Sequence, residues 1–190
     1  THYASRFTFH VSRNTHYALP CYVLFALLSC GSPPLVVPEP GTMATDFTLT
    51  DQYDSKFRLS QFRGEDVLLL GCDKDSIEQG GAWQNVFREQ YAERLRILPI
   101  VNVSGLPRFA RWFLKGRMKA ALRGEAGEPK PPSILLDWDG NVSKRYGMRP
   151  QTCTVVLIDR AGQVRFVQPL GQIDEAAMQA TFDRINQQIR

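Results

Sequence analysis

The chain has 190 residues and a mass of 21.5 kDa, which is enough for one domain of ordinary size with a hydrophobic core. Hydrophobic residues make up 43% of the sequence and charged residues 22%, close to the globular average, which argues against a disordered chain, a collagen-like chain and a multi-span membrane protein. The formal net charge of +4 is too small a surplus to indicate nucleic-acid binding.

The first 37 residues have the pattern of an export leader followed by a tether. Two arginines and no acidic residue lie ahead of an apolar run at residues 17–28. A basic segment followed by about 7–15 apolar residues is typical of a secretory signal peptide, whereas a membrane span needs about 20. Residues 31–34 are all turn-formers. We therefore expect a leader and tether at residues 1–37 and a folded domain at residues 38–190.

The end of the apolar run suggests a lipid attachment site. Residues 27–31 read LLSCG, which resembles the lipobox of bacterial lipoproteins, whose cysteine is acylated. The resemblance implies lipidation at Cys30 and a location in the bacterial cell envelope or periplasm. Two alternatives stay open. The segment is a plain signal peptide, or it is an upstream stretch wrongly joined to the gene, in which case the protein is cytoplasmic.

The folded domain lacks the residues that many catalytic sites need. All three histidines lie in the first sixteen residues, so residues 39–190 contain none. Their absence excludes from the domain a Ser-His-Asp triad, a Cys-His protease site and a His-ligated zinc or haem. Two cysteines, Cys72 and Cys153, are too few for a four-thiolate metal site. We therefore expect neither a metal nor a cofactor.

The domain opens with a pattern of strands and continues with alternating helices and strands. Alternating apolar and polar residues at 47–50 and 57–60 predict a β-hairpin. The continuous apolar run at 67–70 is expected of a central strand buried on both faces. The remaining predicted elements are a helix at 79–95, a strand at 97–103, a helix at 107–123, a loop at 125–132, a strand at 133–136, a short helix at 141–146, a hairpin of strands at 154–158 and 164–167, and a helix at 174–189 with Asp174 as its N-cap. This order of elements predicts an α/β sheet with helices on both faces.

Several phrases of the sequence resemble a known family. They are GTMATDFTL at residues 41–49, LSQFRG at 59–64, LDWDGNVSKRYG at 136–147 and TVVLIDRAG at 154–162. In this order and spacing they are similar to the redoxin branch of the thioredoxin superfamily, which includes the peroxiredoxins of the AhpC/TSA type. The resemblance implies a thioredoxin-like fold, with a central mixed sheet flanked by helices and an N-terminal β-hairpin.

The catalytic motif of the family is where this chain departs. Relatives carry a reactive cysteine in a C-x-x-C or T-x-x-C motif after the first core strand, where a helix N-terminus stabilises the thiolate. The corresponding loop, residues 71–81, has Ser76 and Gln79 at the positions of the thioredoxin-type cysteines, and Gly80 near that of the peroxiredoxin cysteine. The loop also holds three acidic residues, which disfavour a thiolate nearby. A serine hydroxyl without an adjacent base is a poor replacement.

The two cysteines of the domain are therefore the remaining candidates for thiol chemistry. The resemblance places Cys72 at the exit of the first core strand and Cys153 at the entry of a neighbouring strand, where relatives carry a cis-proline, so it implies that the two are close in space. Three interpretations stay open. The cysteines are small buried hydrophobic residues, they form a structural disulfide in an oxidising compartment, or they are a relocated redox pair.

A basic and aromatic segment lies within the predicted helix at 107–123. Four of its basic residues are spaced by three or four positions and share one helix face: Arg108, Arg111, Lys115 and Lys119. Phe109, Trp112 and Phe113 add aromatic bulk. Such a helix can rest on an anionic membrane. The alternative is a solvated charged face with the aromatic side chains in the core. We do not expect nucleic-acid binding.

Two functions are compatible with these observations. In the first, the protein is an exported redoxin-family member that has lost its redox motif and acts by binding, for instance to an envelope protein. In the second, it is a thiol-dependent oxidoreductase or an antioxidant peroxidase that works through Cys72. Cys153 would then be the resolving thiol, and a thiol reductant would be the partner.

Overall fold

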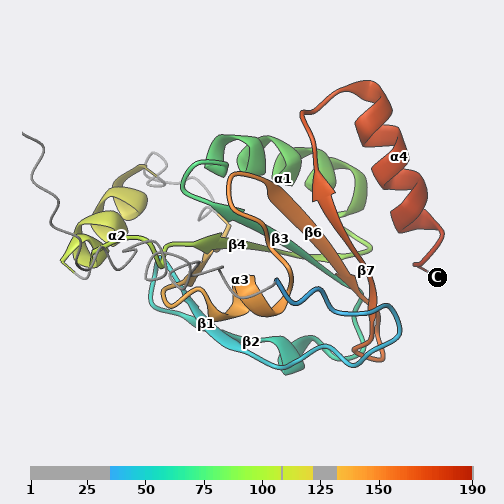
Figure 1. The fold of residues 1–190 in the computed structure, drawn as a ribbon, viewed down its shortest axis with the longest axis horizontal. Coiled ribbons are helices and arrows are strands. Elements are labelled where there is room, and N and C mark those ends of the chain that lie inside the picture. The colour runs from blue at the N-terminus through green and yellow to red at the C-terminus, as the bar shows by residue number, and fades with distance from the viewer. Residues whose placement is uncertain (1–34, 108, 122–131, 190) are drawn as a thin grey trace, which may run out of the picture. The chain divides into compact units, whose positions relative to one another are not determined.

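The computed structural model describes residues 35–107, 109–121 and 132–189, and a seven-stranded sheet runs through this part of the chain (Figure 1). The strands lie in the order β2-β1-β5-β4-β3-β6-β7. Their bounds are β1 Thr48–Asp51, β2 Lys56–Arg58, β3 Val67–Asp73, β4 Arg96–Asn102, β5 Leu135–Asp137, β6 Cys153–Ile158 and β7 Val164–Leu170. The described helices are the 3-10 helix η1 Leu59–Phe62 and the α-helices α1 Ile77–Tyr91, α2 Ala110–Ala121, α3 Asn141–Arg145 and α4 Glu175–Asn186.

The sheet contains both parallel and antiparallel pairs. β3 pairs in parallel with β4, and β4 pairs in parallel with β5. On its other side β3 pairs antiparallel with β6, which continues into the hairpin with β7. β1 pairs antiparallel with β2, with Thr48 opposite Arg58. The predicted mixed sheet and N-terminal hairpin are therefore confirmed.

β3 occupies the centre of the sheet because its residues can be buried on both faces. Every residue from Val67 to Cys72 is buried, as the apolar run in the sequence predicts. Alternate side chains point to opposite faces of a strand. Leu68 and Leu70 accordingly pack in one hydrophobic cluster, and Val67 and Leu69 pack in another.

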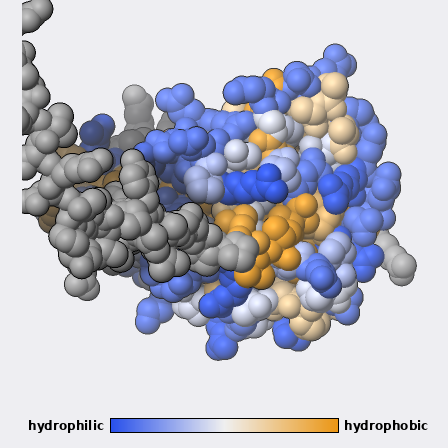
Figure 2. All heavy atoms as spheres, viewed as in Figure 1, coloured by the Kyte–Doolittle hydropathy of each residue, from blue (hydrophilic) through white to orange (hydrophobic). Residues whose placement is uncertain are grey.

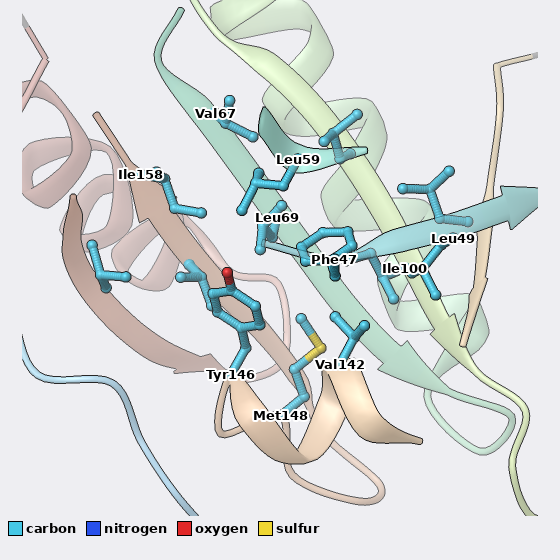
Figure 3. Packing of buried hydrophobic residues seen from close by; sticks show 14 residues of the cluster. Phe47, Leu49, Leu59, Val67, Leu69, Ile100, Val142, Tyr146, Met148 and Ile158 are labelled. Carbon is cyan, nitrogen blue, oxygen red and sulfur yellow. The ribbon is translucent and has the colours of Figure 1, made fainter. Parts of the chain in front are cut away.

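The two clusters correspond to helices on the two faces of the sheet. α1 and α4 lie on one side and α3 on the other (Figure 1). On the first side Trp83 and Phe87 of α1 are fully buried. Figure 3 shows the second side, where Tyr146 packs edge-on against Phe47 with ring centroids 5.7 Å apart. The Tyr146 hydroxyl donates to the Thr45 carbonyl at 2.6 Å. Helices on both faces are thus confirmed.

The ends of the helices differ in how closely they follow the sequence pattern. Asp174 caps α4 as predicted, because its carboxylate accepts the backbone N–H of Ala177 at 2.7 Å. α2 starts at Ala110 and not at Pro107, whose carbonyl accepts the Ala110 N–H in a turn ahead of the helix.

Within the described ranges, no helix has the length and apolar composition needed to cross a membrane.

The predicted loop at residues 71–81 is shorter in the structure. β3 extends through Asp73, and α1 begins at Ile77, so only three residues connect them. The strand is longer because Gly71 continues the ladder opposite Thr154, which the apolar run alone does not indicate. Residues 1–34 of the leader and tether predicted at 1–37, and most of the predicted loop at 125–132, lie outside the described residues.

Exposed apolar side chains are confined to a few places on the described surface. Hydrophilic side chains cover most of the face shown in Figure 2, with a hydrophobic patch near its middle. The large hydrophobic residues that are exposed lie in the segment before β1, at the start of α1, and in and just before α2. They are Leu35, Val36, Val37, Met43, Ile77, Phe109, Trp112 and Phe113.

Candidate functional site

Cys72 and Cys153 lie side by side at one end of the sheet. Gly71 of β3 is opposite Thr154 of β6, so the next step of the antiparallel register places the two cysteines opposite each other. Both thiols are free, and their Sγ atoms are 2.8 Å apart, with one thiol donating to the other. Cys72 is 7% exposed and Cys153 is fully buried. The structure therefore brings together the two cysteines that the sequence singled out.

Helix α1 closes over this pair through a glycine. The Gly80 N–H donates to the Ser76 carbonyl at 2.9 Å, and the same carbonyl accepts from the Cys153 thiol at 3.3 Å. A Cβ atom at Gly80 would lie only 2.3 Å from the Sγ atom of Cys72. Only a residue without a side chain fits there. Glycine is unfavourable inside a helix, and this was the signal in the sequence that could have revealed the close approach.

Burial and mutual hydrogen bonding shape the ionisation of the pair. The hydrogen bond with Cys153 and burial raise the pKa of Cys72, and the Asp73 carboxylate raises it further. The hydrogen bond from Cys72 lowers the pKa of Cys153, while burial acts against this. The first thiolate of the pair is therefore stabilised by the remaining S–H, and the second is strongly disfavoured. The pair holds at least one proton at neutral pH.

Asp73 organises the connection between β3 and α1, a role that sequence reasoning missed. One carboxylate oxygen accepts from the N–H of Asp75, the N–H of Ser76 and the Ser76 hydroxyl, and the other accepts from the Gln151 N–H at 2.7 Å. Burial alone would raise the pKa of Asp73, but these hydrogen bonds outweigh burial and lower it. A fixed negative charge therefore lies 2.8 Å from the Ser76 hydroxyl, just ahead of α1.

Neither Ser76 nor Gln79, the residues predicted to stand at the positions of the family's cysteines, is free to react. Ser76 precedes α1 and is 4% exposed. Its hydroxyl donates to the Asp73 carboxylate at 2.8 Å and accepts the Asp73 N–H at 3.0 Å, so it is fully engaged within its own loop. Gln79 lies in the first turn of α1 and donates to the Gly171 carbonyl at 2.6 Å. Both side chains hold the fold together at this end of the helix.

A small hollow in the surface is lined in part by Cys72. Apolar residues of α1 and β4 line it, among them Ile77, Pro99 and Val101, and Cys153 is not part of its wall. Of the two thiols, Cys72 is thus the one that a small molecule could approach. Gly80 also lines the hollow and leaves it open toward the sulfur.

The basic segment of α2 is only partly arranged as the sequence suggested. Lys115 forms an ion pair with Asp54 and lies 5.9 Å from the centre of the Trp138 ring, so it packs against the domain. Residue 108 and the side chains of Arg111 and Lys119 lie outside the described residues, as does Cys30.

The aromatic side chains of this segment do not lie in the core. Phe109, Trp112 and Phe113 are 84%, 83% and 58% exposed. The interpretation that places them in the core is therefore wrong. Leu114 instead supplies the contact with the domain, where it packs against the buried cluster of Val101, Val103 and Leu136. Three consecutive apolar or aromatic positions, at 112–114, leave the inward face of a helix undetermined, so the sequence pattern could not decide the question.

Comparison with known proteins supports the fold. No protein-family model matches the sequence, and no curated protein matches it. Solved structures do match. A candidate thiol:disulfide interchange protein DsbE from Chlorobium tepidum has a TM-score of 0.58 and 21% identity, covering 79% of this chain and 97% of that protein. The exposed lipoprotein thioredoxin of Streptococcus pneumoniae has a TM-score of 0.54 and 22% identity, covering 73% and 98%.

A third similar structure comes from the peroxidases of this fold. The thiol peroxidase of Chromobacterium violaceum has a TM-score of 0.53 and 18% identity, covering 82% of this chain and 93% of that protein. The chain therefore has a thioredoxin-like fold, as its sequence phrases predict, and its structural neighbours include thiol oxidoreductases and peroxidases. At these identities the similarity establishes the fold, and the assignment to the redoxin branch stays a prediction.

Proposed function

We propose that this protein is an exported thioredoxin-fold protein that acts by binding and has lost thiol exchange at the helix N-terminus. The observation that carries the proposal is Ser76, at the position of the lost nucleophile. It is buried, and its hydroxyl both donates to and accepts from Asp73. With that hydroxyl engaged and no base beside it other than a structural carboxylate, the site has no nucleophile to offer a protein substrate.

The buried cysteine pair does not replace the lost nucleophile for protein substrates. Exchange with a protein disulfide proceeds through a mixed disulfide, so the attacking sulfur must be an accessible thiolate. Cys153 is fully buried and Cys72 nearly so, and the pKa of Cys72 is raised by its hydrogen bond with Cys153 and by burial. In an oxidising compartment such a pair closes into an internal disulfide, which stabilises the domain.

Export is part of the proposal. It is supported by the basic and apolar pattern before residue 29 and by the lipobox-like segment that contains Cys30. One of the similar structures is an exposed lipoprotein, and export of a thioredoxin fold is consistent with that. The cell envelope is also a compartment in which the Cys72–Cys153 disulfide persists.

A second candidate function rests on the hollow beside Cys72. A small hydroperoxide could enter there and oxidise the Cys72 thiol to a sulfenic acid, with release of water or an alcohol. The Cys153 thiol, 2.8 Å away, would then condense with it, forming the disulfide and releasing a second water. Two thiols of a reductant would restore the dithiol. This cycle balances two electrons taken by the peroxide against two supplied by the reductant.

Two assays separate the two functions: peroxide consumption and insulin reduction. Both are measured on the wild type, Cys72→Ser and Cys153→Ser. The binding function predicts no turnover with any of the three proteins. Peroxide turnover that disappears in Cys72→Ser would overturn it and establish the second candidate. Thiol counting under non-reducing conditions reports whether the pair closes, and mass spectrometry of the protein isolated from bacterial envelopes reports lipidation at Cys30.

A further inference from the structure

Three exposed aromatic side chains, one just before α2 and two within it, form what we call the outward face of α2. Phe109, Trp112 and Phe113 are spaced by three and four residues, so they share one side of the helix. Their exposures of 84%, 83% and 58% are high for residues of this size. α2 lies at the end of the domain away from α4 (Figure 1).

The opposite side of α2 is held against the domain, so the outward face is set by packing. Leu114 joins a hydrophobic cluster that contains Val101 of β4 and Leu136 of β5. Lys115 pairs with Asp54 and lies over the Trp138 ring. These contacts orient the helix and leave its aromatic side toward the surroundings.

The charge of the segment indicates the chemistry of what it meets. Residues 106–124 contain six basic residues and no acidic residue. Arg117 is exposed, and its guanidinium lies 5.9 Å from the centre of the Phe113 ring, next to the aromatic side. The described surface therefore combines aromatic bulk with the positive charge of Arg117, in a segment whose sequence is basic, and it is complementary to an anionic, partly apolar partner.

We propose that the outward face of α2 binds an anionic membrane surface. Phe109, Trp112 and Phe113 enter the boundary between headgroups and acyl chains, and Arg117 contacts lipid phosphates. Aromatic residues backed by cations on one helix are typical of helices that lie in this interface. A lipid surface offers negative charge along the whole segment, whereas a protein partner would need a matching acidic patch. The inference deepens the proposed binding function and rests on export.

Vesicle binding by the full chain tests the surface, with phosphatidylglycerol vesicles compared with phosphatidylcholine vesicles. The triple variant Phe109→Ser/Trp112→Ser/Phe113→Ser should bind phosphatidylglycerol at least about tenfold more weakly than the wild type, because apolar area is lost from the interface. The matched control Val36→Ser/Met43→Ser removes exposed apolar area elsewhere and should bind like the wild type. Residues 1–34 are the same in every variant, so their own affinity for lipid cancels. A near-ultraviolet circular dichroism spectrum confirms that each variant is folded.

The fluorescence of Trp112 reports whether this side chain enters the lipid surface. The fluorescence difference between the wild type and Trp112→Phe isolates its signal from buried Trp83 and from Trp138. This signal should shift to shorter wavelength and be quenched by brominated phosphatidylglycerol, and added salt should weaken the effect.

An unshifted Trp112 signal, or equal binding by the triple variant, would overturn the proposal. Capture of a protein by a variant with a photocrosslinker at position 112, together with an unquenched Trp112 signal in the wild type, would overturn the proposal in favour of protein docking. Because no thiol is involved, failure here leaves the peroxide and insulin assays unaffected.

Discussion

Gly80 lies directly against Cys72, so that a Cβ atom at position 80 would be 2.3 Å from the Cys72 Sγ atom. The next glycine, Gly81, is also in α1, but a Cβ atom there would have no neighbour within 4 Å. Two adjacent glycines of one helix thus have opposite surroundings. Gly80 lets α1 pack closely against the cysteine pair, whereas Gly81 faces open space.

This pair of glycines gives a matched prediction. Gly80→Ala should lower the free energy of unfolding by about 1–3 kcal/mol, because the methyl group overpacks a rigid site between α1 and β3. Gly81→Ala should raise it by about 0.5–1 kcal/mol through helix propensity alone. Urea denaturation of both variants measures the difference.

A second substitution identifies the clash. In the background Cys72→Ala, which removes the sulfur, Gly80→Ala should cost markedly less than in the wild type. Equal costs in the two backgrounds would show that the closeness of Gly80 to Cys72 does not determine the effect.

Local patterns in the sequence predicted the elements that depend on local physics. The apolar run of β3, the alternation of the β1–β2 hairpin and the Asp174 cap of α4 are each decided by a few neighbouring residues. The proximity of Cys72 to Cys153 came from the family resemblance, since 81 positions separate them.

The rest of the site could not be predicted because it depends on tertiary contacts. The hydrogen bond from the Gln151 N–H to Asp73 spans 78 positions. The closeness of Gly80 to Cys72 depends on the distance at which α1 packs against β3. The aromatic side chains of α2 face outward because Leu114, one position beyond Phe113, takes the inward side.

The hydroxyl of Ser76 should stabilise the fold and take no part in catalysis. Ser76→Ala removes a buried hydroxyl that both donates to and accepts from Asp73, so we expect a loss of about 1–2 kcal/mol in the free energy of unfolding. Any peroxide turnover should be unchanged. Urea denaturation and the peroxide assay on the same preparation check this prediction, and it would fail if stability were retained while turnover was lost.

Asp73 should stabilise the fold at neutral pH and less so in acid. Its hydrogen bonds lower the pKa of Asp73 in the folded state below its value in the unfolded chain. Asp73 therefore contributes fully to stability above the unfolded-state pKa, and this contribution is lost as the pH falls through the folded-state pKa. Asp73→Asn replaces one accepting oxygen with an amide that cannot accept, and it should cost about 1–3 kcal/mol at pH 7. The cost should shrink toward pH 2. The exposed neighbour Asp75 offers a control, since Asp75→Asn should change stability by less than about 0.5 kcal/mol at pH 7.

Asp137 should have the opposite pH dependence. It is fully buried in β5, where one carboxylate oxygen accepts from the N–H and the hydroxyl of Ser143, both at 2.7 Å. Its other oxygen has no hydrogen-bond partner among the described residues. Burial raises the pKa of Asp137, and the nearby Asp139 adds to this, while the Ser143 hydrogen bonds act against it. The folded state therefore holds its proton to a higher pH than the unfolded state.

This difference in proton binding makes the fold lose stability as the pH rises. The contribution of Asp137 is full below the unfolded pKa and declines as the pH increases toward the folded one. Asp137→Asn cannot ionise, so its free energy of unfolding relative to the wild type should increase between about pH 3 and pH 7. The new amide group adds a constant offset, because it leaves an unpaired donor where the wild type has an unpaired acceptor. The slope with pH is therefore the decisive measurement. Urea denaturation at several pH values should give opposite slopes for Asp137→Asn and Asp73→Asn, and a flat difference for Asp137→Asn would show that this buried carboxyl ionises as easily in the fold as in the unfolded chain.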